Sequence, residues 1–241
     1  MTITLPAGNA SEWTGPTGNN TYLLKGDRSV LLDAGVGNPG HVDAVTQWLD
    51  GEPLDLLLIT HHHVDHVAGV PALLARWPGA AIRGGGAGTP LEDGELFEAG
   101  ATRLRAIHTP GHAHDHFCFF DELSRDLFCG DLARIGGTVV IPASTGGSLR
   151  AYLASLRRIR QLRPARLLPA HGPVIEDPEK LIDDYLEHRR QRERQIVEAL
   201  QSGCRTAGEI VERVYVGLPP GLRSAAEETV RAHLQKLDEE G

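Results

Sequence analysis

The sequence predicts an α+β protein in which a larger domain of strands and helices precedes a small, mainly helical domain. Two observations predict this class. Apolar strand segments and helical patterns alternate as far as Pro178, and beyond it long helical patterns continue without a strong strand signal. We therefore expect domains at residues 1–177 and 178–241. The 241 residues, 41% of them hydrophobic, are enough to bury a sizeable core.

The elements of the first domain follow from apolar runs and their spacing. Residues 21–33 are expected to form two strands around a turn at Lys25-Gly26-Asp27, because Gly and Asp favour hairpin turns. Further strands are expected at residues 54–60, 80–83, 102–107, 116–121, 126–129 and 166–168. Helices are expected at residues 40–49, 67–77 and 148–162.

The second domain is expected to consist of helices joined by short turns. Helical patterns run over residues 181–200 and 223–237, and a short helix is expected at 206–215 with Thr206 as its N-cap. This arrangement resembles a small winged-helix module. Its arginine-rich run from His188 is typical of a solvated helix face. We expect the module to pack against the first domain, to dimerise or to cover substrate.

Composition and charge argue against several classes of protein. No apolar run approaches the roughly 18 to 20 residues that a membrane-spanning helix needs, and the N-terminus lacks the features of an export signal. Three cysteines do not make a disulfide scaffold and fit a reducing compartment. We therefore expect a cytoplasmic protein that does not bind membranes. The net charge of -8, with 10 basic against 13 acidic residues in 178–241, disfavours nucleic acid as a partner.

Histidine is concentrated in one part of the chain, because nine of the twelve lie between His61 and His171. The run from Thr60 to His66 comes directly after an expected strand. Four of its side chains can point into one space, namely those of His61, His63, Asp65 and His66. Imidazole nitrogens and carboxylate oxygens in such a cluster suit zinc or a similar divalent ion. The alternative is a surface histidine tract or a tag, but this run lies between an apolar strand and an apolar helix.

Three more candidate ligands each follow an expected strand. They are His112, Asp131 and His171. Glycine stands beside each of them and permits the backbone bends that aim a side chain at a metal from the rim of a sheet. Seven donors are enough for two metal ions with a carboxylate between them.

The order and spacing of these residues resemble the signature of the metallo-β-lactamase superfamily. The run from His61 to His66 has its pattern H-x-H-x-D-H, and the resemblance covers about residues 18–175. It implies a four-layer αββα sandwich. It also implies that one metal is held by His61, His63 and His112, that the second is held by Asp65, His66 and His171, and that Asp131 bridges them.

The segments HGPVI, HRRQRERQI, EIVERVY, LPPGL and RAHLQKLDEEG resemble a group within this superfamily that adds a C-terminal winged-helix-like domain. Studied members of the group cleave single-stranded RNA, and fungal relatives release polyketides from carrier proteins as thioesterases. The resemblance implies a hydrolase with two divalent ions, expected to be Zn²⁺. A hydroxide bridged by the ions would attack an RNA phosphodiester or an acyl thioester. Asp65 and Asp131, which would hold that hydroxide, are the expected catalytic residues.

Other roles are alternatives. A non-catalytic scaffold, or a module that binds nucleic acid or a protein partner, would be expected to lose part of such a costly buried ligand set. β-Lactam hydrolysis is a minor alternative, because such enzymes usually work outside the cytoplasm. A homodimer is a further expectation for the C-terminal module.

Four polar residues are expected around the ligands. His62 occupies the variable position of the motif, and His62 and His114 are expected at the rim, where substrate enters. His116 matches a histidine that packs beneath the site in this superfamily. Asp33 either hydrogen-bonds the ligand loop or is an ordinary turn aspartate.

Overall fold

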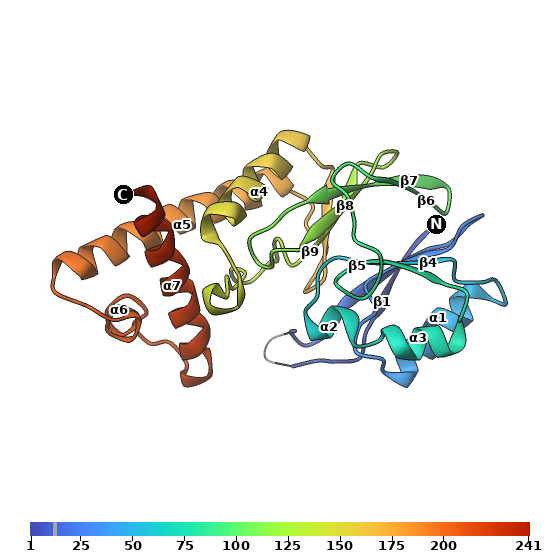
Figure 1. Cartoon of the computed structure of the whole chain (residues 1–241), viewed down its shortest axis with the longest axis horizontal. Helices are drawn as coiled ribbons and strands as arrows, with labels where there is room; N and C mark the ends of the chain where they lie inside the picture. The colour runs from blue at the N-terminus through green and yellow to red at the C-terminus, as the bar shows by residue number, and fades with distance from the viewer. Residues whose placement is uncertain (12–13) are drawn as a thin grey trace.

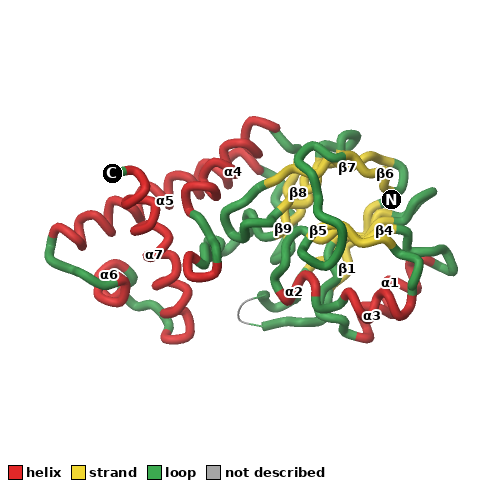
Figure 2. The backbone as a smooth tube through the Cα atoms, viewed as in Figure 1, coloured by secondary structure: helices red, strands yellow, loops and turns green. Residues whose placement is uncertain are grey.

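The computed structural model in Figure 1 describes residues 1–11 and 14–241. Two β-sheets lie face to face with helices on their outer faces, and further helices extend to one side (Figures 1 and 2). This is the four-layer αββα sandwich with a helical C-terminal domain, so the predicted α+β class is confirmed. Among the described residues, no helix is both long enough and apolar enough to cross a membrane.

The first sheet has five strands in the order β1-β2-β3-β4-β5. The strands are β1 (Thr2–Pro6), β2 (Asn20–Leu24), β3 (Val30–Leu32), β4 (Leu56–Ile59) and β5 (Ala81–Gly84). The first three pair antiparallel, whereas β3, β4 and β5 run parallel. The hairpin expected at residues 21–33 is present as β2 and β3.

The second sheet has five strands in the order β10-β9-β8-β7-β6. The strands are β6 (Leu96–Ala99), β7 (Thr102–His108), β8 (Phe117–Asp121), β9 (Asp126–Gly130) and β10 (Arg166–Pro169). All neighbours pair antiparallel except β9 and β10, which are parallel. The sequence did not predict β1 or β6. Both are edge strands in which only alternate residues are buried, so neither has a continuous apolar run.

The core between the sheets is built from alternate side chains of the strands. In β4, Leu56 and Leu58 point into this core, whereas Leu57 and Ile59 pack beneath the outer helices. The outer helices of the first sheet are α1 (Pro39–Leu49), α2 (Val64–Val67) and α3 (Val70–Arg76). The second sheet is covered by α4 (Leu149–Leu162) and by the first half of α5 (Pro178–Gln201).

The segment of residues 178–241 consists of helices joined by short turns and loops. Helix α5 is followed by α6 (Ala207–Val214), the 3₁₀ turn η2 (Pro220–Leu222) and α7 (Arg223–Glu240). Thr206 caps α6 as expected, in a reciprocal pair with Glu209. A second 3₁₀ turn, η1 (Ala143–Thr145), lies in the first domain and contacts α7.

Helix α5 belongs to both cores. Its first half contributes Ile182 and Tyr185 to the core beside α4, and its second half contributes Ile196 and Ala199 to the core shared with α6 and α7. One continuous helix therefore joins the sandwich to the helical domain. The boundary between residues 177 and 178 stays a prediction.

Candidate metal centre

The seven candidate ligands gather at one edge of the sandwich because each follows the end of a strand. His61 comes after β4, His112 after β7, Asp131 after β9 and His171 after β10. The remaining three lie on the loop after β4 and in α2, namely His63, Asp65 and His66. Residues from several regions of the chain thus meet at a single place.

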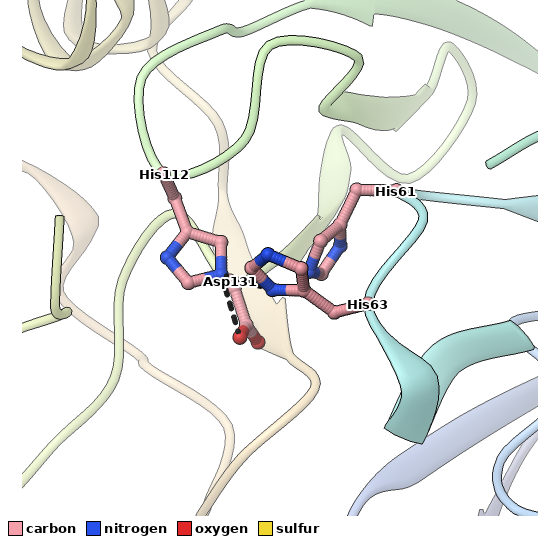
Figure 3. A group of neighbouring side chains, drawn as sticks. All are labelled: His61, His63, His112 and Asp131. Atoms are coloured by element: carbon pink, nitrogen blue, oxygen red, sulfur yellow. Dashed lines mark hydrogen bonds and ion pairs between the residues drawn. The ribbon is translucent and has the colours of Figure 1, made fainter. Parts of the chain in front are cut away.

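The first group consists of His61, His63, His112 and Asp131, whose ligand atoms all lie within 4.8 Å of one another. Figure 3 shows the three imidazoles and the carboxylate pointing toward a common centre. His112 Nε2 lies 2.9 Å from His63 Nδ1 and 3.3 Å from Asp131 Oδ2. The spacing is that of donors around one ion.

The second group consists of Asp65, His66 and His171, with ligand atoms again within 4.8 Å. His171 Nε2 lies 3.4 Å from Asp65 Oδ2. Asp131 reaches this group through its other oxygen, since Oδ1 lies 3.2 Å from His171 Nε2 and 3.6 Å from His66 Nε2. The two oxygens of Asp131 therefore face different groups, which is the arrangement a bridging ligand requires.

Several donor atoms of this cluster are buried without a hydrogen bond from any described residue. They are His61 Nε2, His66 Nε2 and Asp131 Oδ1. A buried polar atom that lacks a partner costs about 1–3 kcal/mol. All three atoms face the cluster, where a cation would satisfy them. The residues present therefore fit two divalent ions held by imidazole and carboxylate donors.

The outward nitrogens of three imidazoles are held by partners behind the cluster, whereas His171 Nδ1 is buried without a hydrogen bond from any described residue. His61 Nδ1 lies 3.0 Å from Thr60 Oγ1, and His112 Nδ1 lies 2.8 Å from the carbonyl oxygen of Val140. His66 Nδ1 lies 2.8 Å from Asp33 Oδ2. These contacts leave Nε2 of each ring for a metal and fix the ring orientation.

Asp33 does more than an ordinary turn aspartate. Its Oδ1 accepts from the backbone N–H of Thr60 at 2.8 Å, while its Oδ2 faces His66. Asp33 itself has a φ of 62°, an uncommon left-handed conformation for a non-glycine residue. Of the two alternatives for Asp33, the structure shows the one in which it hydrogen-bonds the ligand loop.

His116 lies beneath the cluster, where the sequence placed it. Its Nε2 accepts from the backbone N–H of Asp131 at 3.1 Å, and its Nδ1 lies 2.8 Å from Thr109 Oγ1. The His116 ring lies so close to the backbone of Gly130 that a Cβ on this glycine would lie 2.8 Å from His116 Nε2. A glycine is needed there to present Asp131 to both groups.

A cavity of about 280 Å³ opens beside the cluster. Ligands from both groups line one side of it, including Asp65 and Asp131. The rest of its wall is formed by Thr14, Gly130, Ala133, Arg134, Thr138, Val139, Val140 and Pro142. His62 and His114 do not line this cavity. His62 is paired with Asp115 instead, with His62 Nδ1 2.7 Å from Asp115 Oδ1.

Comparison with protein families agrees with this geometry. Residues 14–94 and 79–171 match the metallo-beta-lactamase superfamily, and residues 206–241 match the beta-lactamase associated winged helix domain. The chain belongs to the metallo-beta-lactamase superfamily. It is a hydrolase of that fold with an added winged-helix domain.

Two fungal relatives match most of this chain. Lactamase-like protein adaB of Aspergillus niger is 34% identical over an alignment of 246 positions, which covers 92% of this chain and 76% of adaB. Atrochrysone carboxyl ACP thioesterase nsrC of Aspergillus novofumigatus is 32% identical over an alignment of 245 positions, which covers 93% of this chain and 74% of nsrC.

Solved structures of the superfamily share the fold. A metallo-beta-lactamase family protein from Thermus thermophilus superimposes with a TM-score of 0.82 and 24% identity, covering 100% of this chain and 94% of that one. TTHA1623, solved in a di-iron-bound form, has a TM-score of 0.59 and 28% identity over 78% of this chain and 97% of its own.

The two groups of candidate ligands differ in their electrostatic environment. Burial alone would raise the pKa of Asp131, but His171 and His66 hold it well below its usual range. Burial opposes protonation of His171, yet Asp131 and Asp65 raise its pKa to about 10. Burial and His112 lower the pKa of His63 to about 4. The second group is thus the more negative environment, and cations bind there by displacing protons.

The sequence missed two parts of the site. Asn19 donates from Nδ2 to Asp65 Oδ2 at 3.0 Å, and the only signal for it was a pair of asparagines before a strand. The loop of residues 133–142, which supplies six of the thirteen residues that line the cavity, has no periodic pattern. Helix α5 supports this loop, since Tyr185 Oη lies 2.8 Å from the carbonyl oxygens of Arg134 and Gly137.

Proposed function

We propose that this protein is a dinuclear, metal-dependent hydrolase of acyl thioesters. The observation that carries the proposal is the position of Asp131, whose two oxygens face two groups of ligands at the wall of a largely apolar cavity. A nucleophile formed at the cluster would thus meet an acyl group held in the cavity.

The chain's own residues position the chemistry. Two divalent ions, when bound, supply a hydroxide nucleophile near neutral pH and polarise the bond to be cleaved. Asp131 and Asp65 both line the cavity, and would hold the ions and orient the nucleophile toward an acyl group bound there. Asn19 orients Asp65, and the backbone N–H of Asp131 is fixed on His116.

The cavity wall supports an acyl substrate. Ala133, Val139, Val140 and Pro142 offer apolar surface opposite the ligands. Binding an acyl chain against such surface is favourable at roughly 25 cal/mol for each Å² of apolar area removed from water. A thioesterase among the relatives, nsrC, is named for an acyl-carrier-protein substrate, which supports the same class of substrate here.

RNA is the weaker substrate candidate. The chain has a net charge of -8, and the segment 178–241 is acidic as well, so the net charge supplies no overall attraction for a nucleic acid. RNA cleavage is therefore kept as an outcome of the experiment.

We propose zinc as the resident metal. Five of the seven donors are imidazoles, which suit Zn²⁺, and two carboxylates complete the set. Imidazole also binds iron, and TTHA1623 was solved with two iron ions. Elemental analysis of the purified protein separates the two metals: zinc at about two ions per chain is expected, and iron would contradict the proposal.

The substrate class is tested by assaying two substrates in parallel. Metal-loaded protein is given acyl thioesters of increasing chain length and a fluorogenic single-stranded RNA. We expect thioester hydrolysis that falls at least about 100-fold in Asp131→Ala, with the exposed Asp43→Ala as the matched control. RNA cleavage without thioester turnover, or full thioester activity in Asp131→Ala, would contradict the proposal.

A further inference from the structure

A second cluster of metal-binding side chains lies next to the seven ligands. His62, His114 and Asp115 each offer one ligand atom, and these atoms lie within 4.8 Å of one another. His62 Nδ1 lies 2.7 Å from Asp115 Oδ1, and the ring centroids of His62 and His114 are 5.3 Å apart. Two imidazoles and a carboxylate thus converge within the span that a single ion requires.

The cluster is separate from the site described above. None of its residues lines the cavity, and none belongs to the two groups that Asp131 joins. The His62 side chain is 40% exposed, Asp115 is 23% exposed, and His114 lies at the surface. A hydrated ion can therefore reach the cluster directly from solvent.

The hydrogen bond between His62 and Asp115 does not by itself account for the cluster. That hydrogen bond uses one nitrogen of His62 and one oxygen of Asp115, whereas His114 lies beside them without such a bond. Within residues 1–11 and 14–241, no hydrogen bond engages a ring nitrogen of His114; its loop is held through its carbonyl oxygen, 3.0 Å from His108 Nε2. An imidazole beside a His–Asp pair is the third donor of a His₂Asp site.

We propose that His62, His114 and Asp115 form a third divalent-cation site, at the surface of the protein beside the dinuclear centre. Imidazole and carboxylate donors favour Zn²⁺ and similar transition-metal ions over Ca²⁺ or Mg²⁺. Three protein donors leave at least one position of a tetrahedral ion to water. The site is therefore weaker than the two buried groups.

Such an ion would join two loops that carry ligands of the dinuclear centre. His62 stands between His61 and His63 after β4, whereas His114 and Asp115 follow His112 after β7. The pair His62–Asp115 is separated by 53 positions in the chain. An ion there would act as a cross-link between the loops and restrict their relative movement.

The site is tested by counting ions on the intact protein. Wild type that already holds its dinuclear complement is dialysed against increasing Zn²⁺, and bound zinc is measured by elemental analysis. We expect about three ions per chain at saturation, with the last bound most weakly. His114→Ala and Asp115→Asn should each stop at about two, whereas His188→Ala, which removes a partly buried imidazole of α5, should keep all three.

The outcomes separate this site from the proposed function. Saturation of wild type at two ions, or a third ion that persists in both His114→Ala and Asp115→Asn, would overturn the third site. Thioester hydrolysis by a two-ion wild type would leave the proposed function standing without it. A three-ion wild type that is inert on thioesters would do the reverse.

Discussion

The guanidinium group of Arg189 donates a hydrogen bond to the carbonyl oxygen of Val139, and so connects α5 to the wall of the cavity. Arg189 is 1% exposed, so the prediction of a solvated face for the run from His188 is wrong at this residue, and its guanidinium lies 5.5 Å from the ring centroid of Tyr152. The next carbonyl oxygen along the chain, that of Val140, lies 2.8 Å from His112 Nδ1. A side chain of helix α5 thus contacts the loop whose next residue, Val140, holds a candidate metal ligand.

Removing this support should weaken metal binding. In Arg189→Met, the buried carbonyl of Val139 loses its partner, at a cost of about 1–3 kcal/mol in the free energy of unfolding. We also expect affinity for the ion at His112 to fall about 10-fold, because the loop that carries its acceptor, the carbonyl oxygen of Val140, is no longer held in place by Arg189. Urea unfolding and zinc titration against a chelator measure the two effects.

The neighbouring Arg190 supplies the control. It is exposed on the same helix, and its guanidinium pairs with Glu187 of that helix, so Arg190→Met should leave both quantities near their wild-type values. Equal zinc affinity in the two variants would show that α5 does not position His112.

Replacing Asp33 should weaken metal binding. Asp33→Asn keeps the shape of the side chain but replaces one of two acceptor oxygens, which face Thr60 and His66, with an N–H donor. Loss of such an outer partner typically costs about 10- to 100-fold in metal affinity. Chelator competition measures the change, with the exposed Asp27→Asn as control. Unchanged affinity would mean that His66 needs no partner to bind the ion.

A methyl group at Gly130 should destabilise the protein. A Cβ there would lie 2.8 Å from His116 Nε2 and 3.0 Å from Thr60 Cβ. We expect Gly130→Ala to lower the free energy of unfolding by about 1–3 kcal/mol, the usual effect of overpacking. Gly130 has a positive φ of 49°; Gly136 also has a positive φ, of 84°, but open space around its Cβ position. Equal losses in Gly130→Ala and Gly136→Ala would trace the effect to backbone conformation and not to crowding.

His233 should make the protein less stable in mild acid. Burial first, and then the cations Arg189 and Lys236, lower the pKa of His233 to about 3. Glu193 Oε2 lies 3.3 Å from His233 Nδ1, but the ammonium of Lys236 also pairs with that carboxylate, at 2.9 Å from Oε1.

The sign follows from the direction of the shift. In the unfolded chain His233 has a pKa near 6.5 and binds a proton at pH values where the folded protein leaves it neutral. The contribution of this residue to the free energy of unfolding is therefore fully present above pH 6.5 and declines as pH falls toward 3. Between about pH 7.5 and 5.5 the loss should be about 1.4 kcal/mol. His233→Gln should lack this part of the loss in urea unfolding at the two pH values. The same pH dependence in both proteins would contradict the assignment.

The sequence predicted the ligand set better than its surroundings. The motif from His61 to His66 and the glycine-flanked residues after later strands mark the donors locally, and the structure brings all seven together. The same local signals set the approximate bounds of α1 and α4. What local patterns do not reveal is which side chain meets which over long distances.

Three features illustrate that limit. Arg189 reaches Val139 across 50 positions, and His62 reaches Asp115 across 53, so neither contact leaves a periodic trace in the sequence. The pattern of residues 181–200 predicted a helix, but not that its two halves pack into separate cores. The edge strand β1 escaped notice because its outer residues are exposed.

The central claim is that a pair of ions bridged by Asp131 hydrolyses an acyl thioester. The most direct test removes the metal with a chelator and restores it stepwise, while thioester turnover and bound zinc are measured together. The claim predicts no turnover without metal and full recovery at about two ions per chain, with no recovery in Asp131→Ala. Thioester hydrolysis by metal-free protein, or equal recovery in Asp131→Ala, would contradict it.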